Sequence, residues 1–521
     1  AVEQANAAGG YRGLPFRLIE YEDLPRWGAS SNTIVRMAYE DHVWAALGSV
    51  SGDSSHIAIR VALKALLPVM NSATGDPTLT ETAIPWAFRC IADSRQESYA
   101  LARTIFVEHG LRRIAVIRAN SRYGRMGIVE LRDAAKRLGH PLVTEVNWIP
   151  GAEDLSPLVE RVASTRPDGL VVWGGAEMAG RALAQARALG LDVPAFGPSR
   201  VIDERFLKEA GAAAEGFTAV ATFDPTSSDP AWLAFREVYR QRWDEEPDAY
   251  AAHAFDGMNL VLDAVREAGL NRVRIRAALA AVERYQGVTG PIVFDNTFND
   301  VGPVYLARVE EGAFRYRPEP ANGWRPGEPL VAGRSEAPVT LGLLLSGDGA
   351  ETGSAAERGA RLALAERGAA TLVTSRITGP WSTASQAARD LMVRDGATGL
   401  LTLLDHAGSH AAAQVATRLR RPLITVNDPS TLLHYTGVPW VAGPDGATAP
   451  PGFERSYAER YGAPPCATAR AAYLAARRLL QTLDRGTDRA LAPTPSLLPP
   501  APSSPERAER PVAGGPAGRF R

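Results

Sequence analysis

Short apolar runs alternate with longer amphipathic segments along the first 317 residues of the chain. The apolar runs predict buried strands, because a strand of a parallel sheet is covered on both faces. These runs are FRLIEY, WAALGS, LPVMNS, RIAVIR, LVTEVNW, GLVVWGG and AEGFTAVATF. Helices are predicted between them over 94–109, 126–138, 155–165, 176–189, 230–243 and 249–268. Strands that alternate with helices predict an α/β fold built on parallel sheets.

The rest of the chain divides into a linker, a second α/β segment and a tail. A hairpin-like stretch with turn-forming residues from Asn296 to Asp300 closes the first unit at residue 317. Residues 318–338 are rich in Pro and Gly and have no period, which predicts a linker. The alternation resumes with VTLGLLLSG, and residues 339–490 are predicted to form a second, partial α/β domain. The Pro-rich segment 491–521 cannot bury a core and is predicted to be disordered.

An internal repeat relates the two folded segments. At a constant offset of 354, the matches are Asp41 with Asp395, Ser55-His56 with Ser409-His410, Ala58 with Ala412, Pro68 with Pro422, and Pro85-Trp86 with Pro439-Trp440. Further along, an offset of 218 aligns Phe235 with Phe453, Tyr239 with Tyr457, Arg242 with Arg460 and Pro247 with Pro465. The offsets differ by 136 residues, so the second copy omits about that length of chain between Trp86 and Phe235.

The repeat also bears on the start of the chain. In the second copy a strand from Thr340 to Ser346 precedes a helix over 355–367, and residues 1–8 correspond to that helix. Either the first copy has lost a strand and a loop, or the true N-terminus is missing from this sequence. The residues leave both interpretations open.

Composition and motifs exclude several classes of function. The net charge of -1 provides no overall field for nucleic acid or for an anionic membrane. No apolar run approaches the roughly 20 residues that span a bilayer. The two cysteines, Cys90 and Cys466, fit no metal motif. The sequence contains no GxSxG, Walker or HExxH motif, so we expect neither an enzyme nor a cofactor or metal ion.

Several motifs of the first unit resemble the type I periplasmic binding proteins, in the branched-chain amino-acid and amide branch that serves ABC transporters. The motifs include AVEQANAAGGYRGLPFRLIEYED, VWAALGSVSGDSSHIAIRVALKALLPVMNSATGDPTLT, WAFRCIADSRQESYALARTIF, RRIAVIRANSRYGRMG and FREVYRQRWDEEPDAYAAHAFDG. The resemblance implies two α/β lobes, with lobe one at about 1–111 and 224–317 and lobe two at about 112–223. By the same resemblance, the second copy corresponds to lobe one alone.

The resemblance implies an extracytoplasmic substrate-binding protein that captures a small polar solute by lobe closure and delivers it to an ABC permease. Contact with a membrane would then occur only through the permease or through a lipid anchor in a missing N-terminus, and the chain would lie in the periplasm. The alternative is a ligand-sensing domain of a signalling or regulatory protein, because one fold serves several functions. The sequence contains no output module, and this favours transport.

Three loops follow predicted strands, where doubly wound sheets bind ligands. In the first, Asp53, Ser54 and Ser55 could bind a ligand carboxylate at a helix N-terminus, or simply cap that helix. In the second, the resemblance implies that Ser72 contacts the ligand through its backbone and Thr74 through its hydroxyl. The alternative is an ordinary turn at the end of a strand. In the third, the resemblance implies that Tyr123 closes over the ligand, and packing at the hinge is the alternative.

Two positions depart from the family's amino-acid binders. The resemblance implies an aromatic residue at position 176 and an acid at position 199 that pairs with the ligand ammonium, but the chain has Ala176 and Ser199, followed by Arg200. Glu177, Asp203 and Asp224 are candidates to replace the acid, although each could equally be a solvated surface residue. We therefore expect a ligand with a carboxylate or amide group, and weak binding of leucine-like amino acids. Arg200 would favour an acidic ligand.

The second copy is predicted to lack a high-affinity site. A binding cleft needs two lobes, and the offsets leave this copy with one. Its loop from Asp405 to Ser409 lacks the Asp-Ser-Ser run of the first copy, and its segment Val426-Asn427-Asp428 lacks the Ser-Ala-Thr run. It would pack against the first copy, contact a partner such as the permease, or have no role.

Overall fold

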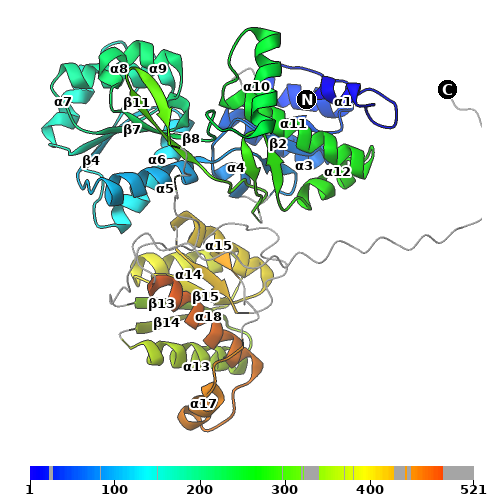
Figure 1. Cartoon of the computed structure of the whole chain (residues 1–521). Helices are drawn as coiled ribbons and strands as arrows, with labels where there is room; N and C mark the ends of the chain where they lie inside the picture. Colours follow the sequence, from blue (N-terminus) through cyan, green and yellow to red (C-terminus); the bar gives the residue numbers. More distant parts are fainter. Residues whose placement is uncertain are drawn as a thin grey trace, which may run out of the picture.

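The computed structural model in Figure 1 describes residues 1–22, 27–81, 84–149, 151–295, 297–317, 321, 339–368, 370–379, 381–419, 421–426, 441–442 and 448–484. The predicted tail, the predicted linker except for Ala321, and Asn296 lie outside the described residues. Among the helices that are described, none combines the length and the apolar character needed to cross a bilayer.

The first unit begins with a three-stranded parallel sheet, which we call the sheet of lobe one. Its strands are β1 (Ala46–Leu47), β2 (Val69–Asn71) and β3 (Ala87–Arg89), in that order. The helices of this lobe are α1 (Val2–Ala7), α2 (Trp27–Tyr39), α3 (Gly52–Ala65), α4 (Thr78–Glu81), α10 (Pro230–Trp243), α11 (Ala249–Ala268) and α12 (Arg272–Ala280). The hairpin β9 (Tyr285–Gly287) and β10 (Gly290–Ile292) also belongs to it. Met70 and Phe88 from the sheet are buried against Leu260 and Val261 of α11, which fixes that helix on one face.

Lobe two is built on a seven-stranded sheet in the order β12-β11-β8-β7-β6-β4-β5. The strands are β4 (Ile114–Ala119), β5 (Thr144–Trp148), β6 (Gly169–Trp173), β7 (Ala195–Gly197), β8 (Thr218–Ala221), β11 (Tyr305–Glu310) and β12 (Ala313–Tyr316). Its helices are α5 (Ser94–Ala102), α6 (Arg122–Arg137), α7 (Ser156–Ser164), α8 (Ala176–Ala188) and α9 (Glu204–Ala210). Strands β4, β5, β6, β7 and β8 run parallel. Of these, β4, β6, β7 and β8 carry apolar side chains on both faces, as the sequence predicted, whereas the edge strand β5 buries only Val146 and Trp148 on one face.

The lobe boundaries differ from those expected from the sequence. Tyr99 and Leu101 of α5 are buried with Ile114 and Ile128 in the core of lobe two, so residues 94–111 do not belong to lobe one. Strand β11 pairs antiparallel with β8, and β12 pairs with β11, which places 305–316 in lobe two as well. Without β11, the backbone N–H and C=O groups along one edge of β8 would have no strand to pair with, and β11 pairs with them.

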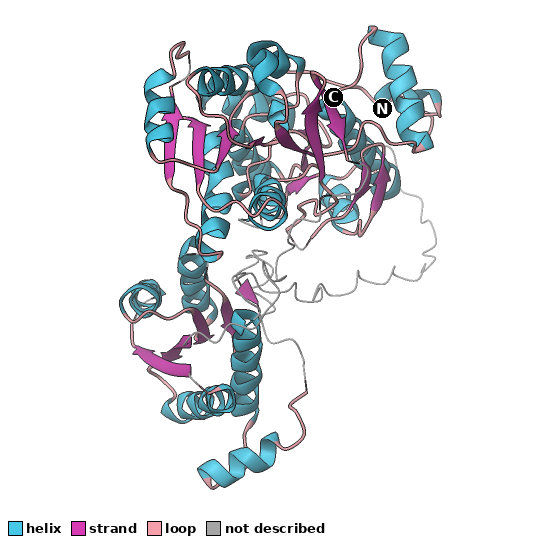
Figure 2. Cartoon of the chain, turned by 60° about the vertical axis from the view of Figure 1, so that its left-hand side comes forward, coloured by secondary structure: helices cyan, strands magenta, loops and turns pink. Residues whose placement is uncertain are grey.

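The second unit has five parallel strands in the order β14-β13-β15-β16-β17. They are β13 (Val339–Ser346), β14 (Ala370–Ile377), β15 (Gly399–Leu403), β16 (Leu423–Thr425) and β17 (Val441–Ala442). Helices α13 (Ala350–Arg367), α14 (Trp381–Arg389), α15 (His406–Leu419), α17 (Phe453–Tyr461) and α18 (Ala467–Asp484) accompany them. The two faces of the sheet bury separate apolar clusters, one with α13 and α18 and one with α14 and α15, and Figure 2 shows these layers.

Several elements of the two units lie at the offsets that the sequence matches predict. The offset of 354 carries β2 onto β16 and the start of α3 onto the start of α15. The offset of 218 carries the start of α11 onto the start of α18. The match of Pro85-Trp86 with Pro439-Trp440 lies outside the described residues. Elements and not only single identities therefore coincide, which favours the interpretation of the second unit as a partial copy of lobe one.

The run FRLIEY was predicted to be a strand, and this prediction is wrong. The offset of 354 aligns it with β14, which pairs along its whole length with β13. Among the described residues of the first unit, no strand takes the place of β13 beside β1. A strand needs a hydrogen-bonded neighbour, so this segment stays irregular. Leu18 is consequently 49% exposed, whereas Leu372, its counterpart, is 7% exposed.

Candidate ligand-binding site

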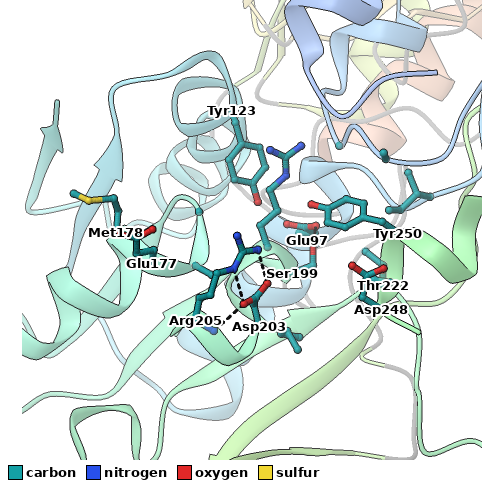
Figure 3. A pocket seen from close by; sticks show the side chains of 18 of the residues that line it. Glu97, Tyr123, Glu177, Met178, Ser199, Asp203, Arg205, Thr222, Asp248 and Tyr250 are labelled. Atoms are coloured by element: carbon teal, nitrogen blue, oxygen red, sulfur yellow. Dashed lines mark hydrogen bonds and ion pairs between the residues drawn. The ribbon is translucent and has the colours of Figure 1, made fainter. Parts of the chain in front are cut away.

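A cavity of about 430 Å³ lies between the two lobes of the first unit. Its walls come from loops that follow β2, β5, β6 and β7, at the carboxyl ends of these strands, where this class of sheet binds ligands. Lobe one contributes Ala73, Gly75, Asp248, Ala249 and Tyr250, and lobe two contributes Glu97, Tyr123, Trp148, Ala176, Ser199, Arg200, Asp203 and Arg205, among others. Figure 3 shows most of these polar and aromatic side chains around one space.

Four residues singled out from the sequence line this cavity: Tyr123, Ala176, Ser199 and Arg200. The guanidinium of Arg200 lies 4.1 Å from the centre of the Tyr123 ring, in a cation–π arrangement. The same guanidinium donates a 3.0 Å hydrogen bond to the carbonyl of Val50, so it reaches from lobe two to lobe one. Burial raises the pKa of Tyr123, and the phenol stays neutral.

The other five predicted residues, Asp53, Ser54, Ser55, Ser72 and Thr74, are not among the lining residues. The first three form the first turn of α3, whose N-cap is Ser51: its hydroxyl accepts a 3.3 Å hydrogen bond from the backbone N–H of Ser54.

The segment 72–74 forms a tight turn instead of presenting hydroxyls to the cavity. The Asn71 side chain accepts hydrogen bonds from the backbone N–H groups of Ala73 and Thr74, at 3.1 and 2.8 Å. This turn brings Ala73 and Gly75 to the cavity wall.

Sequence reasoning missed Glu97, a buried acid in the cavity wall. Its side chain is in the first turn of α5, and the residue is only 3% exposed. Ser199 donates a 2.6 Å hydrogen bond from its hydroxyl to Oε1 of Glu97. Burial raises the pKa of Glu97 to about 7, although the Ser199 hydrogen bond and the charge of Arg200 oppose this shift.

A local signal for Glu97 was present in the sequence. The capping box formed by Asp93 and Gln96 starts a helix directly after β3, so an acid one residue later lies at a strand's carboxyl end.

The three acids that the sequence offered as replacements for an acid at position 199, Glu177, Asp203 and Asp224, have other partners. Glu177 and Asp203 line the cavity, but Glu177 pairs with Arg181 at 3.4 Å and Asp203 with Arg205 at 2.7 Å. Figure 3 shows the second of these pairs. Asp224 is not among the lining residues and accepts a 2.6 Å hydrogen bond from Thr226 in its own turn.

A polar cluster joins the two lobes beside the cavity. Arg122, at the start of α6 in lobe two, contacts the carboxylate of Asp76 in lobe one through its Nε atom. The Nη2 atom of Arg122 lies 2.8 Å from the Thr78 hydroxyl and 3.0 Å from Nε2 of His56. Burial would raise the pKa of Asp76, but the hydrogen bonds from His56 and Arg122 outweigh it and hold the pKa well below its usual range. Asp76 is therefore ionised, and it binds the two lobes together through Arg122.

Within the described part of the chain, no group of three or more His, Cys, Asp and Glu side chains is placed to hold a metal ion. The cavity offers hydrogen-bonding groups, two aromatic phenols and one incompletely paired carboxyl group. Such a site can bind and orient a small polar molecule.

Comparisons with known proteins agree with this geometry. Residues 1–313 match the Periplasmic binding protein family. The leucine-, isoleucine-, valine-, threonine- and alanine-binding protein of Pseudomonas aeruginosa is 23% identical over 300 residues, which cover 57% of this chain and 79% of the relative.

Two solved structures share the fold. A branched-chain amino-acid transporter substrate-binding protein of Streptococcus pneumoniae, in complex with isoleucine, has a TM-score of 0.55 at 23% identity and covers 61% of this chain and 92% of its own. A solute-binding protein of an ABC transporter from R. palustris, in complex with benzoate, has a TM-score of 0.56 at 17% identity. The match covers 61% of this chain and 89% of the R. palustris protein.

Proposed function

Since the chain belongs to the periplasmic binding protein family, as the sequence motifs predicted, we propose that it is the substrate-binding component of an ABC transporter. It captures a small polar solute, such as an amino acid, an amide or a related carboxylate, between its two lobes. It then presents the closed complex to a membrane permease on the extracytoplasmic side. This role needs no covalent chemistry.

The observation that supports this function best is the cavity between the lobes. Its volume of about 430 Å³ falls within the range typical of small-molecule sites, and both lobes contribute polar groups to it. Arg200 and Arg122 of lobe two already contact Val50 and Asp76 of lobe one. A ligand that contacts both lobes stabilises the closed arrangement, because it adds contacts absent from the open one.

Thermal-shift titration of the purified protein with amino acids, amides and small carboxylates tests the proposal. A true ligand is expected to raise Tm by mass action. Small-angle scattering should show a smaller radius of gyration with the ligand than without it. If the ligand raises Tm and the radius of gyration stays constant, capture by closure is wrong.

Replacing Arg122 by methionine is expected to weaken ligand binding by roughly tenfold, since losing hydrogen bonds to a charged group costs about 1–2 kcal/mol. The variant leaves the cavity wall intact but removes the partner of Asp76 across the lobes. Calorimetric titration measures the affinity, and scattering measures how much of the protein is closed. Arg125→Met, at an exposed position of the same helix, is the control and should bind as the unmodified protein does.

Deleting residues 335–521 is expected to leave ligand affinity nearly unchanged. Every residue that lines the cavity lies between Ala73 and Tyr250, in the first unit. The deletion variant should therefore bind the same ligand within about twofold, as measured by titration. A collapse of affinity in a variant whose circular dichroism is preserved would mean that the second unit contributes to the site.

A further inference from the structure

We propose that the Glu97 carboxylate is the partner of a cationic ammonium group on the ligand, in place of the acid that Ser199 replaces. The proposal rests on the proposed function and names the ligand class: small solutes that carry an ammonium group. It reverses the expectation of weak amino-acid binding drawn from Ser199 alone.

The hydrogen bonds of Glu97 leave one of its carboxylate oxygens without a partner. Oε1 accepts from the Ser199 hydroxyl at 2.6 Å, whereas Oε2 is fully buried and has no hydrogen-bond partner among the described residues. Leaving such a group unpaired costs about 1–3 kcal/mol or more, so native structures rarely do so without a reason. Figure 3 shows Glu97 beside Ser199 and Tyr250 in the cavity wall.

The nearest basic side chain has other contacts. Arg200 donates to the Val50 carbonyl at 3.0 Å and stacks on the Tyr123 ring at 4.1 Å. It therefore lowers the cost of ionising Glu97 without occupying Oε2.

An aromatic ring adds to a setting suited to a cation. Tyr250, from lobe one, lines the same cavity as Glu97, whereas the Tyr123 ring is already stacked on Arg200. Electron-rich ring faces attract an ammonium group, and a carboxylate at their side adds a charged hydrogen bond. The Ser199 hydroxyl then acts as a positioning group, because it orients Glu97 from position 199, where the family resemblance implies an acid in amino-acid binders.

Ligand affinity should depend on pH in a specific way. Besides Ser199, the titratable or charged groups around Glu97 are Arg200, Asp93, Tyr123 and Tyr250. Burial raises the pKa of both tyrosines, which stay neutral near pH 7. Ammonium binding requires ionised Glu97, so affinity should rise by up to tenfold per pH unit from pH 5.5 towards the pKa of about 7 and then level off.

Calorimetric titration of the full chain tests the proposal with two probe sets: the proteinogenic amino acids, and the matching carboxylates and amides that lack the α-amino group. We expect at least one amino acid to bind and its des-amino analogue to bind at least tenfold more weakly. In Glu97→Gln the amino acid should lose at least tenfold in affinity, together with the pH dependence. The double variant Glu97→Ala with Ser199→Glu, which returns the acid to position 199, should restore most of the binding.

Asp224→Asn, which removes an acid outside the cavity wall, is the control and should change nothing. If des-amino carboxylates or amides bind and amino acids do not, the assignment of Glu97 is overturned while the proposed function stands. Equal amino-acid affinity in Glu97→Gln would overturn it as well. If neither probe set binds, the proposed function fails together with the assignment. The double variant keeps the test valid if Glu97→Gln folds poorly.

Discussion

Replacing Arg89 by methionine is expected to lower the free energy of unfolding by about 3–5 kcal/mol, the usual cost of breaking a buried ion pair from one side. Arg89 is fully buried at the end of β3, where the chain passes from lobe one to lobe two. Its guanidinium donates to Asp93 at 3.0 Å, to Asn299 at 2.7 Å and to the carbonyl of Asp76 at 2.5 Å. Methionine has similar length but no donors, so Oδ1 of Asn299 would lose its hydrogen bond and the buried carboxylate of Asp93 would lose its opposite charge.

Chemical denaturation at pH 7, followed by circular dichroism, measures this loss. Arg236→Met is the matched control: its guanidinium pairs with Glu246 at 2.7 and 3.0 Å, but on the surface, where such pairs contribute less than about 1 kcal/mol. Adding Asp93→Asn to the Arg89 variant should recover part of the loss, because it removes the unpaired charge. Equal destabilisation by the two arginine replacements would contradict the role of Arg89 at the lobe junction.

The ligand-free protein is expected to be more stable near pH 5.5 than at pH 8, by a few kcal/mol. Burial raises the pKa of Glu97 and Asp300 to about 7 and that of Asp93 to about 6. For a carboxyl group whose folded pKa is raised, folding favours the protonated form. Its contribution is complete below the unfolded pKa of about 4 and is lost as pH rises through the folded pKa, at about 1.4 kcal/mol per unit.

His253 has the opposite effect on the dependence of stability on pH, and it acts at acidic pH. Burial lowers its pKa to about 4, so its neutral form is favoured by folding and stability is lost as pH falls from about 6.5 towards 4. Carboxyl groups whose pKa is lowered, such as that of Asp76, act in the same direction as His253, but they titrate below pH 5.5. The buried acids with raised pKa therefore dominate between pH 5.5 and 8. Scanning calorimetry across this range measures the difference in Tm.

Asp300→Asn is the variant that tests the carboxyl contribution. The asparagine Oδ1 can still accept from the backbone N–H groups of Val293 and Gly302, as Asp300 does at 3.0 and 2.8 Å. It cannot ionise, so the fall in Tm between pH 5.5 and 8 should be smaller than in the unmodified protein. Glu246→Gln, on the surface, should leave that fall unchanged. A Tm that rises steadily towards pH 8 would show that these carboxyl groups are ionised in the folded protein at little cost.

The fold class and the family could be predicted from the residues alone, and the constant offsets predicted a second, shorter copy of part of the fold. Apolar runs such as RIAVIR and GLVVWGG became the central strands β4 and β6, because a continuous run of this kind is stable only when covered on both faces. The constant offsets predicted which elements correspond, since side-chain periodicity and turn residues are local properties. Tyr123 and Ser199 were found through the family resemblance and lie in the cavity wall.

Which residues meet in the site depends on how the chain folds over long distances and could not be predicted from local patterns. Glu97 and Ser199 are 102 positions apart, and the fold of lobe two brings them to 2.6 Å. The partner of β11 is β8 and not a strand of lobe one, because strand pairing depends on which sheet edge is open and no local signal encodes that choice. FRLIEY failed as a strand for the same reason: its residues favour a strand, but a strand also requires a hydrogen-bonding neighbour, and the neighbour is a property of the assembled sheet.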